Sequence, residues 1–207
     1  MSNQKLLFDE DNQKVVFDLP DAEIELSNNF FSNEESDELF RSLIDSIKWQ
    51  QDQIQFYGKT FNVPRLSALY GDKNKPYSYS GITMYPHEWT PDLLLIKQRI
   101  EEVAKVEFST CLLNYYRDGM DSNDWHQDNE KELGHNPVIA SMSFGETRPF
   151  QLKHLHKPDL KKIDIPLSHG SFLLMQGKTQ HFWKHKIPKT KKKIKPRINL
   201  TFRIIKN

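Results

Sequence analysis

Two segments of the chain place apolar residues at the spacing of a helix. The first begins at Ser32, which can cap a helix that carries Glu35 three residues later. Its apolar stripe consists of Leu39, Phe40, Leu43, Ile44 and Ile47. The second begins at Pro91, because proline is favoured in the first turn of a helix. Its expected apolar side consists of Leu94, Leu95, Ile96, Ile100 and Val103.

Beyond Phe108 the pattern changes to short apolar runs separated by turn residues. Strands are expected at 112–116, 139–144, 150–154, 162–167, 171–175, 182–185 and 197–205. Short strands at near-regular spacing favour a sandwich or barrel over a parallel α/β sheet. The acidic, polar residues 1–29 predict a loose extension with one strand at 22–26, and the aromatic-rich residues 53–86 predict hairpins. The expected fold class is therefore mostly β with flanking helices (α+β).

Composition narrows the class of protein. A chain of 207 residues suits one structural domain. No apolar run approaches the roughly 20 residues that cross a bilayer, and the first ten residues lack the pattern of a secretory signal. The single cysteine, Cys111, cannot form an internal disulfide or a cysteine-based zinc site. It is expected to be a buried apolar residue in a reducing compartment.

Charge is unevenly distributed in a chain of net charge +1. Residues 1–45 hold 12 acidic and 3 basic side chains, whereas residues 165–207 hold 11 Lys and Arg and no Asp or Glu. A basic face of this kind can bind a polyanion, but a solvated lysine loop has the same composition. Charge alone does not decide between the two.

The segment 125–130, Trp-His-Gln-Asp-Asn-Glu, carries the first chemical signal. In an extended segment, residues two apart point to the same side, so His126 and Asp128 can present an imidazole and a carboxylate together. A second imidazole is available downstream at His185, with His181 as a competitor. Two imidazoles and one carboxylate are typical of non-haem iron(II) oxygenases. The His-x-Asp pair by itself favours an exposed loop that happens to contain both residues.

The strand expected at 197–205 alternates polar and apolar residues. Arg197, Asn199, Thr201 and Arg203 fall on one face, and apolar side chains fall on the other. Arginine binds carboxylates through paired hydrogen bonds, so two arginines in a barrel interior would need an anion, and a dicarboxylate could engage both. Asn114 and Tyr116 show the same spacing on an earlier strand. Polar faces exposed to water would show the same alternation.

Taken together, these residues resemble the AlkB family of iron(II)- and 2-oxoglutarate-dependent dioxygenases that repair alkylated nucleic acid, and most closely its branch that acts on duplex DNA. The resemblance covers residues 53–205. Its motifs are residues 55–59, 63–65, 70–72, 77–81, 114–119, 126–130, 139–145, 169–171 and 196–203. It implies a double-stranded β-helix (jelly roll) core, with an N-terminal helical and aromatic hairpin region for nucleotide recognition.

The resemblance also implies how the chain is divided. Residues 1–50 would form the acidic extension and first helix, residues 51–110 the nucleotide-recognition hairpins and second helix, and residues 111–207 the catalytic core. The implied iron ligands, which are also the catalytic residues, are His126, Asp128 and His185. The residues implied to bind 2-oxoglutarate are Asn114, Tyr116, Arg197, Asn199, Thr201 and Arg203. Within this set, Arg203 would lie beside the metal and Arg197 at the far carboxylate.

A third implied set binds the damaged base. Its members are Phe56, Tyr57, Gly58, Lys59, Arg65, Tyr77, Tyr79, Ser80, Asn129 and Glu130. Residues 56–58 would form a finger that fills the space of a flipped base, and Tyr77 and Tyr79 would line the base opposite His126. Phe56, Tyr79 and Asn129 depart from residues common in the duplex branch, which bears on the preferred lesion and strand state.

The expected activity is oxidative demethylation of bases such as 1-methyladenine and 3-methylcytosine in DNA. It would use Fe(II), 2-oxoglutarate and O2, and release formaldehyde, succinate and CO2. The alternatives are an RNA demethylase of the same family, a hydroxylase of a protein or small molecule, and a nucleic-acid-binding module without activity. The expected partner is alkylated DNA, with no membrane, for a monomer that is intracellular: cytoplasmic if bacterial, nuclear if eukaryotic.

Overall fold

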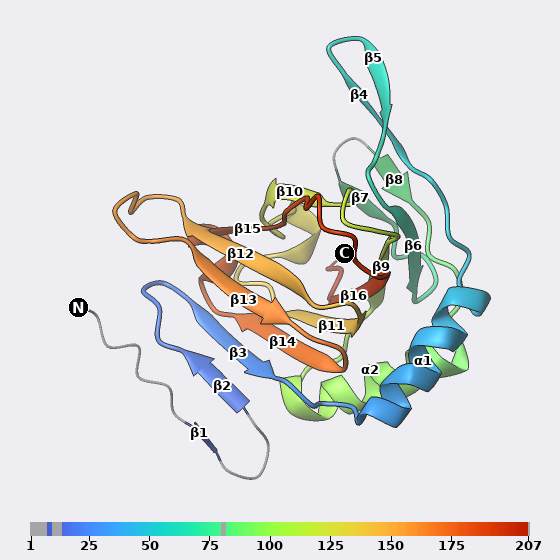
Figure 1. Ribbon diagram of the computed structural model, residues 1–207, viewed down its shortest axis with the longest axis horizontal. Helices are drawn as coiled ribbons and strands as arrows, with labels where there is room; N and C mark the ends of the chain where they lie inside the picture. Colours follow the sequence, from blue (N-terminus) through green and yellow to red (C-terminus); the bar gives the residue numbers. More distant parts are fainter. Residues whose placement is uncertain (1–7, 10–13, 80–81, 207) are drawn as a thin grey trace.

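Two antiparallel β-sheets that face each other form the centre of the molecule (Figure 1). The computed structural model describes residues 8–9, 14–79 and 82–206. The larger sheet contains, in spatial order, β1 (Phe8–Asp9), β2 (Lys14–Phe17), β3 (Glu23–Ser27), β14 (Ser171–Gln176), β11 (Ile139–Gly145), β16 (Arg197–Arg203), β9 (Thr110–Tyr116) and β6 (Leu66–Gly71). The smaller sheet contains β10 (Asn123–His126), β15 (Trp183–Ile187), β12 (Arg148–His154) and β13 (Ile163–Leu167). The expected mostly-β fold with flanking helices is confirmed.

Two helices cover the larger sheet on the side away from the smaller one (Figure 1). The first, α1 (Asn33–Ser46), starts with the expected capping box: the Ser32 hydroxyl accepts from the Glu35 amide, and the Glu35 carboxylate accepts from the Ser32 amide. The second, α2 (Pro91–Ala104), starts at the expected proline and is capped by Thr90.

The prediction of which side of α2 is buried is partly wrong. The buried residues are Leu93, Ile96, Ile100 and Ala104. Leu94, Leu95 and Val103 are instead 48%, 50% and 42% exposed. Both sides of this helix carry apolar residues, so the side that packs against the larger sheet is the one that is buried.

Strand β16 separates two layers of core. Ile198, Leu200 and Phe202 pack with the helices, in the cluster that fills the outer layer. The alternate residues from Arg197 to Arg203 face the smaller sheet, as expected from the pleat. A second apolar cluster, which includes Leu152 and Trp183, fills the space between the sheets. All seven residues of β16 are buried, so its polar side chains lie inside the protein.

The N-terminal region is more ordered than the sequence predicted. Instead of one strand in residues 1–29, β2 and β3 form an antiparallel hairpin, and β3 pairs with β14 in the larger sheet. The strand expected at 182–185 is present as β15, which starts one residue later and follows a short helix, α3 (Thr179–Phe182). A single 3-10 turn, η1 (Lys131–Leu133), follows β10.

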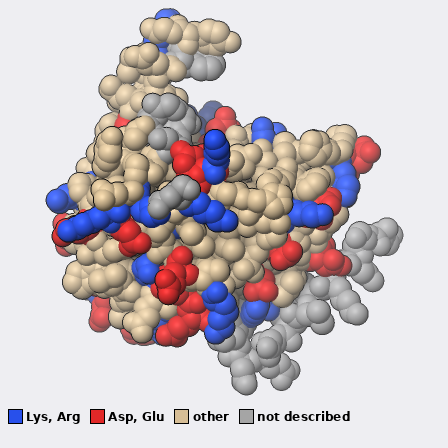
Figure 2. Space-filling model, turned by 180° about the vertical axis from the view of Figure 1, so that it is seen from behind, with Lys and Arg blue, Asp and Glu red and all other residues tan. Residues whose placement is uncertain are grey.

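Two further hairpins lie beside the larger sheet. One pairs β4 (Gln53–Phe56) with β5 (Lys59–Asn62), and the other pairs β7 (Tyr77–Tyr79) with β8 (Ile82–Met84). The β4–β5 hairpin projects well beyond the rest of the molecule (Figure 1). Seen from behind, it extends past a surface on which basic and acidic side chains are mixed (Figure 2). Among the described residues, no helix is long and apolar enough to cross a membrane.

Candidate active site

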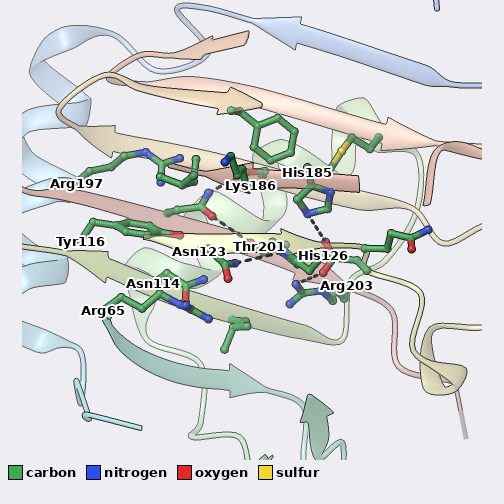
Figure 3. A pocket seen from close by; sticks show the side chains of 18 of the residues that line it. Arg65, Asn114, Tyr116, Asn123, His126, His185, Lys186, Arg197, Thr201 and Arg203 are labelled. Atoms are coloured by element: carbon green, nitrogen blue, oxygen red, sulfur yellow. Dashed lines mark hydrogen bonds and ion pairs between the residues drawn. The ribbon is translucent and has the colours of Figure 1, made fainter. Parts of the chain in front are cut away.

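A cavity of about 260 Å³ lies between the two sheets. Its walls come mainly from β9 and β16 of the larger sheet and from β10 and β15 of the smaller one. All the residues expected to bind metal and cosubstrate line this one space (Figure 3). Residues far apart in the sequence therefore meet because the two sheets face each other.

The three expected metal ligands form a compact cluster. His126 ends β10, Asp128 follows it, and His185 lies on the neighbouring β15, directly opposite His126 in the strand pairing. One ligand atom from each of these side chains lies within 4.8 Å of the others. The ring of Phe150 stacks on His185, with 4.9 Å between ring centroids. His181, the competing imidazole, contacts Asn136 instead.

The cluster is in the protonation state that metal binding requires. Burial, with a contribution from His126, lowers the pKa of His185 to about 3, and burial also lowers the pKa of His126. Burial alone would raise the pKa of Asp128, but the neighbouring Arg203 and the two imidazoles lower it to about 2. At neutral pH the site therefore offers two neutral imidazoles and one carboxylate, a donor set that fits Fe(II).

Backbone contacts orient the first imidazole. Nδ1 of His126 lies 2.7 Å from the carbonyl oxygen of Asp124. In the neutral ring this nitrogen carries the proton and donates it to the carbonyl, which leaves the lone pair of Nε2 for a metal. The side chain of Asn123 lies 3.2 Å from that Nε2 and completes the local contacts of the ring.

Gln180 holds the segment that carries Asp128. Its side-chain oxygen accepts a hydrogen bond from the Asp128 amide at 3.0 Å, and its backbone oxygen accepts one from the Gln127 side chain at 2.7 Å. Gln180 is 1% exposed and lies on α3, which leads directly into the strand of His185. It therefore couples the two parts of the chain that supply metal ligands. No sequence pattern indicates this role beyond the nearness of Gln180 to His185.

The two arginines of β16 lie at opposite ends of the cavity (Figure 3). Arg203 is beside the metal cluster, where its Nη2 lies 2.7 Å from Oδ1 of Asp128. Arg197 is at the far end, where its Cζ lies 5.3 Å from the ring centroid of Tyr116. The Arg197 guanidinium also donates a hydrogen bond to the Ser143 hydroxyl. Burial lowers the pKa of Arg197 to about 10, so the group is still cationic at neutral pH.

Both guanidinium groups have unused donors. Nε and Nη1 of Arg197 and Nε of Arg203 are buried and have no hydrogen-bond partner among the described residues. Buried donors without partners are rare in native proteins, because each costs about 1–3 kcal/mol. Two such groups at the ends of one cavity fit a dicarboxylate such as 2-oxoglutarate, which would satisfy them.

The remaining residues expected at the cosubstrate lie between the arginines. Asn114 on β9 pairs in register with Asn199 on β16, and Thr201 donates to the Asn199 side-chain oxygen at 3.3 Å. Asn199 also donates to the Ser141 hydroxyl at 2.8 Å. Ser141, Asn199 and Thr201 are thus linked by hydrogen bonds between their side chains.

Some of the residues expected to bind the base lie at the same cavity. Arg65 is buried and donates to the Asn114 side chain at 2.6 Å and to the carbonyl of Ser122. Tyr77 is buried, and the Cζ of Arg203 lies over its ring, 4.8 Å from the ring centroid. The Tyr77 side chain also interacts with Glu130. Burial, reinforced by Asp128, raises the pKa of Glu130.

The other expected base-binding residues lie elsewhere. Tyr57 and Gly58 form the turn of the β4–β5 hairpin with φ values of 48° and 70°, and Tyr57 is 90% exposed. Lys59 follows them on the exposed β5. Asn129 is exposed and does not line the cavity. Ser80 and the side chains of Phe56 and Tyr79 lie outside the described residues.

A second buried arginine, which was not expected from the sequence, lies at the far end of the cavity. Arg148 is 1% exposed and donates to the carbonyl oxygens of Asp118, Asp121 and Pro188. Its Cζ lies 5.7 Å from the ring centroid of Tyr116, which also contacts Arg197. No residue spacing in the sequence indicates this role, because Arg148 stands alone in an expected turn. Its burial results from the folding of distant segments around it.

Comparison with known proteins agrees with this geometry. The family model of the 2OG-Fe(II) oxygenase superfamily matches residues 23–203. The chain is 42% identical to alpha-ketoglutarate-dependent dioxygenase alkB homolog 3 of Bos taurus, over 87% of this chain and 65% of that protein. It is 38% identical to DNA oxidative demethylase ALKBH2 of Homo sapiens, over 84% of this chain and 70% of that protein. The chain thus spans slightly less than two thirds of the alkB homolog 3 relative.

Solved structures show the same fold. "The structure of OsALKBH1" superposes with a TM-score of 0.61 at 18% identity, over 87% of this chain and 96% of the other. A prolyl hydroxylase from Trichoplax adhaerens gives a TM-score of 0.61 at 11% identity, over 88% and 83%. The expected jelly-roll class is therefore shared with other oxygenases, and the resemblance extends to alkB homolog 3 as well as ALKBH2. The chain belongs to the 2OG-Fe(II) oxygenase superfamily and, within it, to the AlkB homologues.

Proposed function

We propose that this protein oxidatively demethylates alkylated bases in DNA, of the 1-methyladenine and 3-methylcytosine type, and depends on Fe(II), 2-oxoglutarate and O2. The observation that carries the proposal is one cavity with a His-Asp-His cluster at one end and a buried, incompletely bonded arginine at the other. The relatives named DNA oxidative demethylase, 36–38% identical in mouse and human, support DNA as the substrate.

The protein supplies the binding groups. His126, Asp128 and His185 would hold the iron, while Arg203 and Arg197 would bind the two carboxylates of 2-oxoglutarate. When bound, iron, cosubstrate and O2 supply the oxidation of the methyl group, with release of succinate, CO2 and formaldehyde. The apolar cluster between the sheets, which includes Leu152 and Trp183, excludes water from one side of the site.

The base would reach the metal after leaving its stack. A methyl group on a pairing nitrogen weakens the base pair, so extrusion of a damaged base costs less than extrusion of a normal one. Tyr77, Arg65 and Glu130 line the cavity and offer hydrogen-bonding groups to the edge of the base. Tyr57, which is exposed at the hairpin tip, would fill the vacated space in a duplex, and the exposed lysines within 178–197 would contact phosphates.

We further propose that the protein acts as an intracellular monomer. Its single cysteine is buried and free, which suits a reducing compartment. The described residues contain no helix able to cross a membrane.

The decisive test is formaldehyde release and base repair on methylated oligonucleotides with Fe(II) and 2-oxoglutarate. Single-stranded DNA, duplex DNA and single-stranded RNA of one sequence should be compared, with unmethylated strands as controls. Repair of methylated DNA is expected. Higher turnover on RNA than on either form of DNA would replace the proposed substrate with RNA. Metal and 2-oxoglutarate binding without turnover on any oligonucleotide would favour a hydroxylase of another substrate.

A further inference from the structure

Three lysines surround one indole on the smaller sheet. The ammonium groups of Lys153, Lys186 and Lys162 lie 4.4, 4.8 and 5.8 Å from the ring centroid of Trp125. Trp125 lies on β10, Lys186 on β15 and Lys153 on β12, while Lys162 directly precedes β13. All four strands of the sheet, or the segments next to them, therefore contribute to this cluster, which we call the Trp125 lysine cluster.

The cluster adjoins the metal ligands. Trp125 precedes His126, and Lys186 follows His185. Trp125 does not line the cavity that the two imidazoles enter, whereas Lys186 lines that cavity and also reaches the Trp125 ring (Figure 3). On β15, His185 is buried and Lys186 is half-buried.

The positive charge of the cluster is not neutralised by ion pairs among the described residues. None of its three lysines forms an ion pair in the part of the chain that the structure describes. Each contact with the indole is worth only about 0.5–1 kcal/mol at an exposed site. Three ammonium groups around one ring also repel one another. An anionic partner would relieve that repulsion.

Two hollows adjoin the cluster. One, of about 610 Å³, is lined by Trp125, Lys186 and the base of the β4–β5 hairpin, and shares Arg65 and His126 with the active-site cavity. The other, of about 340 Å³, is lined by Lys153, Lys162 and two further lysines, 157 and 184. The cluster therefore stands between the mouth of the active site and a basic hollow.

We propose that the Trp125 lysine cluster binds backbone phosphates of the strand that carries the damaged base, next to the point where that base enters the site. A phosphodiester strand carries one charge per nucleotide, which matches a row of cations running away from the cavity. Trp125 holds the lysine side chains and gives the sugars an apolar surface. This inference rests on the proposed function for the identity of the strand.

The test compares two triple variants that remove the same charge. The first replaces Lys153, Lys162 and Lys186 with Ala. The control replaces Lys73, Lys97 and Lys105 with Ala, on the loop after β6 and on or next to α2. Binding of an unmodified single-stranded 15-mer is measured by fluorescence anisotropy from 50 to 200 mM salt. Thermal unfolding and Co(II) absorption confirm that both variants fold and keep the metal site.

The expected result is a change in salt dependence. Each phosphate contact contributes about 0.7 to the slope of log K against log salt for a single strand, so losing three contacts lowers the slope by about 2. The control should retain the slope of the wild type. Equal slopes for the cluster variant and the control would overturn the proposal. A polyglutamate of equal charge that displaces the oligonucleotide at lower concentration would assign the cluster to an acidic protein instead.

The outcome is separable from that of the demethylation assay. If the slope changes as expected but no methylated oligonucleotide is repaired, the phosphate site stands and the proposed reaction fails. If repair is observed and the slope is unchanged, the reaction stands and the Trp125 lysine cluster has no part in strand binding.

Discussion

Replacing Gln180 with Leu should weaken metal binding although Gln180 is not a ligand. Leucine is similar in size but has no acceptor for the Asp128 amide, which now donates to the Gln180 side chain at 3.0 Å. Asp128 is 3% exposed and Gln180 is 1% exposed, so water cannot easily replace the lost acceptor. The bond from Gln127 to the Gln180 backbone oxygen would survive, since the substitution leaves the backbone unchanged.

The size of the effect follows from the unpaired amide. A buried donor without a partner costs about 1–3 kcal/mol. If the segment that carries Asp128 shifts so that its amide finds another acceptor, the Asp128 carboxylate moves as well. The cost then appears as weaker metal binding. Partners that orient metal ligands typically change affinity by about 10- to 100-fold, which is the same range. The dissociation constant for a divalent metal should therefore rise by about 10- to 100-fold.

Co(II) titration of the metal-free protein, followed by visible absorption, measures this constant without turnover. The matched control is Gln98→Leu, because Gln98 is an exposed residue of α2, on the far side of the larger sheet. Thermal unfolding of both metal-free variants separates a general loss of stability from a change in the site. A Gln180→Leu protein that binds Co(II) within twofold of wild type would refute the coupling through α3.

Three further predictions follow from the site. His185→Ala should abolish turnover and Co(II) absorption while circular dichroism remains that of the wild type, and full activity would move the third ligand to His181. Arg203→Lys should raise the half-saturating concentration of 2-oxoglutarate by about 10-fold or more, because a charge-assisted hydrogen bond is worth about 1.5–3 kcal/mol and lysine lacks the planar fork. Arg197→Ala should raise this concentration to a similar extent. Unchanged values in both variants would show that these arginines do not bind 2-oxoglutarate. Tyr57→Ala should reduce repair of duplex DNA by about 5-fold or more with little effect on single strands, since stacking is worth about 1–3 kcal/mol per base; equal losses would make the hairpin a general scaffold.

Local patterns in the sequence determined several features of this AlkB homologue. The Ser32–Glu35 pair predicted the start of α1, and both side chains form the capping box. The alternation from Arg197 to Arg203 predicted which side chains share a face, because the pleat of a strand has a period of two. Such features depend only on neighbours in the chain, so they can be deduced before any fold is known.

Other features depend on contacts between distant segments. The side of α2 that is buried, the carbonyl contacts of Arg148 and the hold of Gln180 on Asp128 all arise where one element packs on another. A single arginine or glutamine in the sequence does not show whether folding will bury it or what it will meet there. These contacts depend on the tertiary fold, because strand register and sheet packing bring together residues that no local period relates.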